Sequence, residues 1–170
     1  MSSKVLDEVS FAELWGIAIG DGWIGRGSSL CLFISGDPIE DRNYYDNHIK
    51  ELFWKSFNHR VKPRQFAYWG TYGVSIGKKH IVEEFVKNNF PIGKKRAIEI
   101  PAKFKHNKQM AIALLRGVFD TDGTIYFQKS YNKTNGLWKR THHYIPKIRI
   151  SSIVRNFIFD LNNHPLKRVD

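Results

Sequence analysis

Two short segments of the chain carry an aspartate in the same setting. Residues 11–24 read FAELWGIAIGDGWI and residues 112–125 read IALLRGVFDTDGTI, at a constant offset of 101 residues. Asp21 and Asp122 occupy the same place in the two copies, each directly before a glycine. Each follows an apolar, helical pattern, so each carboxylate would lie at a helix C-terminus, where the helix dipole adds negative potential. Two such ends lying together would favour Mg²⁺, which takes one or two carboxylates and completes its coordination with water and phosphate.

Small residues in the same segments indicate how the two helices could meet. Gly16 and Gly20 are four positions apart and share one helical face, and Gly117 and Thr121 offer the same face in the second copy. Two such faces allow close backbone approach, which would bring the two aspartates together. In a single copy, Asp-Gly would be read as a helix ending and turn. The repetition at matching positions favours a metal site.

Composition narrows the class of protein. The 170 residues include 27 Lys and Arg against 16 Asp and Glu, which gives a net charge of +11 and favours a polyanionic partner. The 42% hydrophobic content excludes intrinsic disorder. No apolar run is long enough to cross a bilayer and the first residues do not resemble a signal peptide, so we expect no membrane association. A lone cysteine, Cys31, excludes a disulfide framework. We expect a cytoplasmic, nucleoid-associated location, with an organellar matrix as the alternative.

The apolar periodicity predicts an ordered set of elements around the first copy. Ser10 is the expected N-cap of the first helix, and the polar, basic stretch 91–108 is the best linker candidate. In order, we expect a helix over 11–20, a hairpin over 23–35 with its turn at 25–28, a helix over 41–57, a second hairpin from 60–69 and 72–76, and a helix over 81–89.

The second copy begins in the same way and is shorter. We expect a helix over 109–121, strands over 123–128 and 144–152, a polar, basic loop over 129–143 and a helix over 153–162. The first unit spans about 100 residues, whereas only 60 remain from Ala111 to Asp170. The second unit is therefore expected to be incomplete.

The repeated segments resemble the two motifs of a known family. LWGIAIGDG (14–22) and LRGVFDTDG (115–123) are similar to the motifs of LAGLIDADG homing endonucleases, closest to single-chain, intron-encoded enzymes of archaeal type. The resemblance covers most of residues 10–163. The second copy keeps the Asp-x-Asp-Gly ending through Asp120, where the first copy has Ile19. The family does not use the position of Asp120 as its essential ligand.

The resemblance implies a fold and a division of the chain. The fold is α+β, made of two pseudo-symmetric αββαββα units that form a saddle of antiparallel strands, with the motif helices at their junction. The first unit and its basic linker would occupy residues 1–106, and the second, shortened unit residues 107–170.

The activity implied is site-specific cleavage of double-stranded DNA. Asp21 and Asp122 would hold two or more Mg²⁺ ions, and the metal set also includes the preceding residues Gly20 and Thr121. Hydrolysis of one phosphodiester on each strand of a long, asymmetric target would leave a staggered break. Lys95 lies in a Gly-x-Lys segment similar to one in the family, where a lysine acts near the scissile phosphate. Lys94 is the alternative residue for this role, and either lysine could instead make an ordinary phosphate contact.

Candidate DNA contacts lie on strands that alternate basic or polar residues with apolar ones. Arginine can pair with guanine and glutamine with adenine, or either can hold phosphates. The candidates are Arg26, Arg64, Gln65, Tyr68, Lys147, Arg149 and Lys94. The alternative functions are an RNA-binding intron maturase, with intron RNA as its partner, and a cleavage-impaired DNA-binding protein of the same fold. A monomer is expected, with completion by a second chain as the alternative.

Overall fold

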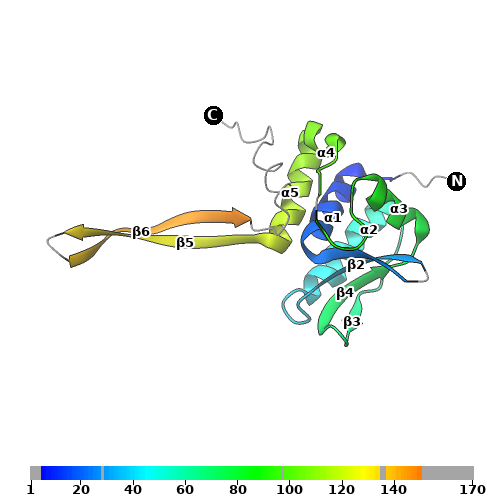
Figure 1. Ribbon diagram of the computed structural model, residues 1–170, viewed down its shortest axis with the longest axis horizontal. Coiled ribbons are helices and arrows are strands. Elements are labelled where there is room, and N and C mark those ends of the chain that lie inside the picture. Colours follow the sequence, from blue (N-terminus) through cyan, green and yellow to red (C-terminus); the bar gives the residue numbers. More distant parts are fainter. Residues whose placement is uncertain (1–4, 28, 97, 135–136, 151–170) are drawn as a thin grey trace.

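The chain folds into an α+β body from which a two-stranded ribbon extends (Figure 1). The computed structural model describes residues 5–27, 29–96, 98–134 and 137–150, and among residues 128–145 it describes the backbone alone. The α+β class expected from the sequence is confirmed. In chain order the elements are α1 (Glu8–Asp21), β1 (Gly22–Arg26), β2 (Leu30–Gly36), the π-helix η1 (Tyr44–Ile49), α2 (Lys50–Phe57), β3 (Arg64–Phe66), β4 (Thr71–Ile76), α3 (Lys79–Lys87), α4 (Ala102–His106), α5 (Lys108–Asp122), β5 (Gly123–Thr134) and β6 (Leu137–Ile150).

Helix α1 is buried along most of its length. Ten consecutive residues from Ser10 to Ile19 are buried, so the helix is surrounded by the rest of the protein instead of covering it. Its N-cap is Asp7, whose side chain accepts hydrogen bonds from the backbone N–H groups of Val9 and Ser10. The prediction of Ser10 as N-cap was wrong, because Asp7 provides an equally good cap one turn earlier and Ser10 donates its hydroxyl to it.

The first unit contains a four-stranded antiparallel sheet in the order β1-β2-β4-β3. Alternation along the strands separates two faces. One face is buried against α1, η1, α2 and α3, and the other is open to solvent. The buried face carries Ile24, Leu32, Ile34, Val74 and Ile76.

The basic stretch 91–108 packs against the body. Ile98, Ile100 and Phe104 are buried in the same core as α1, and Phe104 lies on the short helix α4. Near its start, Gly93 donates its backbone N–H to the carbonyl of Ile24 at 2.7 Å. Apolar residues spaced among the lysines therefore anchor a segment whose charge suggested a free linker.

The second unit, as far as it is described, is α5 followed by the β5–β6 ribbon. The predicted loop over 129–143 is wrong, because the backbones of β5 and β6 pair through most of this stretch. The sequence over 129–143 is polar and lacks apolar alternation, so it gave no strand signal. The expected helix over 153–162 lies outside the described residues. No helix in the described part of the chain is long and apolar enough to span a bilayer.

Candidate metal centre and nucleic-acid interface

The two motif helices, α1 and α5, cross in close contact at their glycines. A methyl group at Gly16 would overlap the carbonyl oxygen of Leu114, and one at Gly117 would overlap the carbonyl oxygen of Glu13. A methyl group at Gly20 would overlap the Thr121 hydroxyl. The expected side-by-side packing is therefore confirmed, and it depends on backbone contacts that no side chain larger than hydrogen allows.

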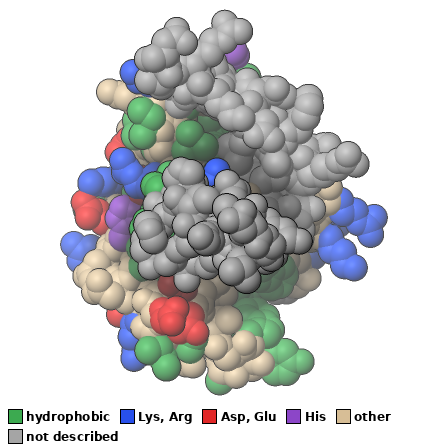
Figure 2. All heavy atoms as spheres, turned by 90° about the vertical axis from the view of Figure 1, so that its left-hand side faces the viewer, with side chains coloured by type: hydrophobic (Ala, Val, Ile, Leu, Met, Phe, Trp, Pro, Cys, Tyr) green, Lys and Arg blue, Asp and Glu red, His purple; other side chains and the backbone are tan. Residues whose placement is uncertain are grey.

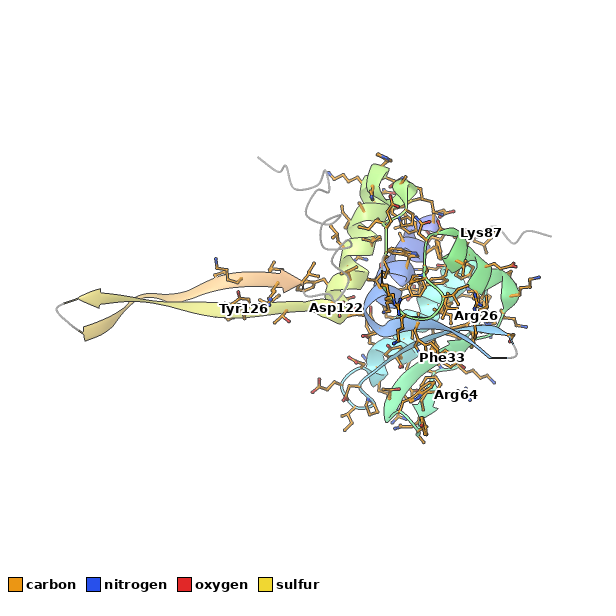
Figure 3. All side chains as sticks on the ribbon, in the orientation of Figure 1. Arg26, Phe33, Arg64, Lys87, Asp122 and Tyr126 are labelled. Carbon is orange, nitrogen blue, oxygen red and sulfur yellow. The ribbon has the colours of Figure 1, made fainter. Side chains whose placement is uncertain are left out.

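This crossing brings the two motif aspartates to one place. A Cβ atom at Gly20, the residue before Asp21, would lie 3.3 Å from the carboxyl carbon of Asp122. Burial and then the negative charges of Asp41 and Asp122 together raise the pKa of Asp21 to about 6. Burial also raises the pKa of Asp122. The duplicated carboxylates thus share a partly desolvated site with a deficit of positive charge. Figure 3 shows Asp122 where the ribbon meets the body.

A third carboxylate, Asp41, joins this pair. The backbone of Gly36 lies against both acids: a Cβ there would be 3.1 Å from the carboxyl carbon of Asp41 and 3.5 Å from the Oδ2 atom of Asp21. Asp41 also accepts a hydrogen bond from the backbone N–H of Asp37 at 2.7 Å. Sequence reasoning missed Asp41, although the acids directly after a strand in a basic chain were a usable signal.

Asp21 and Asp41 open onto a cavity of about 450 Å³. Asp120, the additional acid of the second motif, lines it and accepts a hydrogen bond from the Tyr44 hydroxyl at 3.1 Å. Seen along the ribbon, acidic side chains form a compact group low on this end of the molecule, with Lys and Arg side chains on both flanks (Figure 2). The cavity is lined by Asp21, Gly36, Asp37, Asp41, Tyr44, Asp120 and Thr121.

Lys95 closes the C-terminal end of α1. Its Nζ atom lies 2.5 Å from the carbonyl oxygen of Ile19, 2.9 Å from that of Gly20 and 3.3 Å from that of Ala18. The Ala18 carbonyl also accepts the backbone N–H of Gly22, and the carbonyls of Ile19 and Gly20 belong to the last turn of the helix, where the ammonium group supplies a donor. Burial lowers the pKa of Lys95 to about 8, while the charges of Asp122 and Asp21 raise it. Lys94, next to it, is exposed.

The donor set suits a hard divalent cation. Asp21 and Asp122 supply carboxylate oxygens, and the Gly20 carbonyl, although it accepts from Lys95, keeps a second lone pair. The hydroxyl of Thr121 donates within its own helix, to the carbonyls of Gly117 and Val118, both at 3.2 Å. A cation would also relieve the repulsion that raises the pKa of Asp21.

A second polar cluster lies beside this site. Glu13 is 3% exposed and accepts hydrogen bonds from His48 at 2.6 Å and from Arg116 at 3.0 Å. Its carboxylate, the His48 ring and Asp120 place ligand atoms within 4.8 Å of one another. The hydrogen bond to Glu13 raises the pKa of His48. Because Glu13 already pairs with both His48 and Arg116, the cluster acts as a hydrogen-bonded network that ties α1 to η1 and α5.

The open face of the sheet carries an aromatic cluster that sequence reasoning did not single out. Trp23 stacks on Phe33 with ring centroids 4.7 Å apart, and Trp69 packs edge-on against both rings. Phe66 packs against Phe33 and Trp69. Trp23 and Trp69 remain 39% and 47% exposed. This surface therefore combines exposed aromatic rings with positively charged side chains.

Of the DNA-contacting residues predicted in the first unit, Arg64 is in contact with this cluster. Arg64 lies over the Phe66 ring and donates to the Ser75 hydroxyl at 3.1 Å. Gln65, its neighbour on β3, points to the opposite face of the strand. Arg26 is exposed at the end of β1, and Tyr68 is 96% exposed beyond β3. Figure 3 shows Arg26, Phe33 and Arg64 along the sheet.

The contacts predicted in the second unit lie on the ribbon. Lys147 and Arg149 are exposed on β6 and pair across to Tyr126 and Thr124 of β5. Alternation places them on one face of the ribbon. They therefore extend a basic surface away from the body.

The similarity of this chain to known proteins is one of structure. No family model matches the chain, and no curated protein matches it. Among solved structures, the chain is similar to a crystal structure of a double variant of I-DmoI, in complex with its target DNA nicked in the coding strand and in the presence of 2 mM Mn. The TM-score is 0.49 and the sequence identity 17%; the match covers 71% of this chain and 64% of that chain. The chain thus spans less than two thirds of this neighbour's length.

Proposed function

We propose that the chain is a metal-dependent, site-specific endonuclease of the LAGLIDADG type, acting on double-stranded DNA. The observation that carries the proposal is the meeting of two duplicated aspartates, Asp21 and Asp122, at the ends of helices joined through glycine contacts. A repeat that only ended two helices would not require their carboxylates to share a desolvated site. Hydrolysis of one phosphodiester on each strand would use the near-twofold relation of the two copies.

The residues of the site have separable roles in this proposal. Asp21 and Asp122 hold divalent cations, with Mg²⁺ as the expected ion. A bound cation supplies activation of the attacking water and stabilisation of the leaving oxygen. Lys95 neutralises part of the carboxylate charge and faces both acids. Its ammonium group is held in place by the last carbonyls of α1.

The duplex is held by basic side chains of both units. A net charge of +11 favours the phosphate backbone and makes binding strongly salt-dependent. Arg26 and Arg64 are placed on the sheet of the first unit, and Lys147 and Arg149 on the ribbon of the second. We propose that the open face of the sheet lies in the major groove and that the aromatic cluster contacts base edges there.

Cleavage of a selected duplex tests the function. A target is first selected from a randomised duplex library by binding in Ca²⁺, and is then incubated with Mg²⁺. The wild-type chain should cut both strands. Asp21→Asn and Asp122→Asn should each reduce the cleavage rate by about 100-fold or more while binding is retained.

The matched control is Glu99→Gln, which changes an exposed carboxylate outside the cavity and should cut at the wild-type rate. Wild-type cleavage that persists in both aspartate variants would show that the acids are assigned wrongly. Tight duplex binding without any product would instead support a cleavage-impaired DNA-binding protein.

A further inference from the structure

A second cavity lies on the helical side of the first unit. It has a volume of about 530 Å³, and its walls come from α2 and from the segment that leads to β3. This is within the size range of sites for small organic ligands. Its lining residues are Lys50, Glu51, Trp54, Arg60, Val61 and Lys62.

Trp54 forms the aromatic wall of this cavity. Helix α2 packs into the core through Leu52, Phe53 and Ser56, which leaves Trp54 on the outer side of the helix. Its side chain is 46% exposed. Because α2 packs against α1, which lies on the buried face of the sheet, Trp54 is on the opposite side of the unit from the open face. An exposed tryptophan beside a cavity is a candidate binding surface.

The guanidinium group of Arg60 lies over the indole of Trp54, with 5.2 Å from its central carbon to the ring centroid. Arginine planes and aromatic rings are the two side-chain surfaces on which nucleobases stack. The pair therefore offers a planar platform at the mouth of the cavity.

The remaining side chains make the cavity electropositive. Lys50, Arg60 and Lys62 contribute three positive charges. Glu51 contributes the one negative charge, and it is paired with Lys55 at 2.6 Å. The neighbouring His59 has its pKa lowered by burial and then by nearby Lys78 and His80, so positive charge continues beyond the cavity. A ligand of matching chemistry combines a planar ring with a phosphate.

We propose that this cavity binds single-stranded nucleic acid, with one base stacked on the Trp54–Arg60 platform and the flanking phosphates bound by Lys50 and Lys62. The site is separate from the metal centre and from the open face of the sheet. A single strand and a duplex would therefore bind at the same time. The inference does not depend on cleavage.

Binding of labelled single strands tests this inference. Fluorescein-labelled oligouridylate and oligothymidylate of about 12 nucleotides are titrated with the full chain, and anisotropy gives the Kd. Trp54→Ala should weaken binding by about fivefold or more, because a base loses its stacking partner. Trp54→Phe should restore most of the affinity. Lys62→Gln should weaken binding and reduce its salt dependence by about one charge.

The controls test whether the single-stranded oligonucleotide binds at this cavity. Ile39→Ala, at a side chain that is 85% exposed and outside the cavity, should leave the Kd unchanged. Thermal unfolding of each variant checks that the fold is intact. A bound single strand should stay bound when the selected duplex is added in Ca²⁺.

Three outcomes would overturn the inference. Binding could be equal in the wild-type chain and in Trp54→Ala. The affinity could fall as far in Trp69→Ala as in Trp54→Ala, which would locate the strand on the sheet. Finally, the duplex could displace the strand. None of these results alters the expected metal-dependent cleavage, so the two proposals fail separately.

Discussion

The two copies of the repeated segment fold alike over the helix and the hairpin that follows, and they differ in what covers that hairpin. Ile24 pairs with Leu32 in the first copy, and Ile125 pairs with Ile148 at the corresponding register in the second. Ile24 and Leu32 are fully buried, whereas Ile125 and Ile148 are 60% and 73% exposed. A hairpin thus follows each motif helix with or without a packed face, although its strands are 5 and 7 residues long in the first copy and 12 and 14 in the second.

This difference separates two features of the repeated segment, the candidate site and the packing of the hairpin. The helix contact and the aspartates are present in both copies, and both depend on short-range sequence. Burial of the hairpin depends on η1, α2 and α3, which cover the first copy. No equivalent cover is described for the second copy within residues 98–134 and 137–150. The repeat therefore specifies the candidate site in both copies and a complete core in the first.

The largest expected effect comes from breaking the contact that the two copies share. Gly16→Ala or Gly117→Ala should lower the free energy of unfolding by about 3 kcal/mol or more, because the new methyl group overlaps a carbonyl oxygen of the other helix. Elsewhere in a helix, replacing glycine by alanine stabilises the protein, so a fall in the free energy of unfolding would itself indicate that the contact between the two helices is broken. Urea unfolding measures the change. Gly77→Ala is the matched control, since a Cβ there meets no described atom within 4 Å.

The next prediction compares equivalent residues of the two hairpins. Ile24→Ala should cost about 3 kcal/mol through loss of a fully buried side chain, and Ile125→Ala about 0.5 kcal/mol or less. Both are measured by urea unfolding of the full chain. Equal costs at the two positions would mean that the second hairpin is packed as well as the first.

A smaller effect distinguishes the two aspartates. In EDTA, the free energy of unfolding should fall as the pH rises from about 4 to about 6, because the folded chain holds the Asp21 proton more tightly than the unfolded chain does. Asp21→Asn should remove this fall and stabilise the protein at pH 7 by about 1 to 2 kcal/mol.

Asp122→Asn should give a smaller gain, since the charge of Lys95 opposes the burial that raises the pKa of Asp122. Denaturant unfolding at several pH values measures both variants. A gain from Asp21→Asn that does not grow between pH 4 and pH 6 would contradict the shared, desolvated site.

The smallest effects separate the two lysines that follow the first unit. Lys95→Met should slow cleavage by about tenfold and raise the pKa of Asp21 further, because it removes a cation that faces both acids. Lys94→Met, at an exposed side chain, should weaken DNA binding and reduce the salt slope by about 1. Cleavage rates and binding at several salt concentrations measure the two effects. Identical behaviour of the two variants would leave Lys95 as one more phosphate contact.

Sequence reasoning was most accurate where the signal was local. Gly16 and Gly117 predicted the helix contact because both sides of that contact carry the same repeated pattern. It failed where two nearby residues were both suitable helix N-caps, as with Asp7 and Ser10 at the start of α1. It also failed over 129–143, where the backbone pairs as strands although the sequence has no apolar alternation to reveal them.

The sequence by itself determined the duplicated acidic helix ends, the excess of positive charge and a pair of strands after each motif helix, because each depends on the local sequence of the chain. Only the tertiary structure placed Asp41 beside Asp21 and the Lys95 ammonium on the last carbonyls of α1. It also decided that Trp54 borders a basic cavity on the helical side. These meetings join residues from different elements, and packing of the whole chain sets their distances.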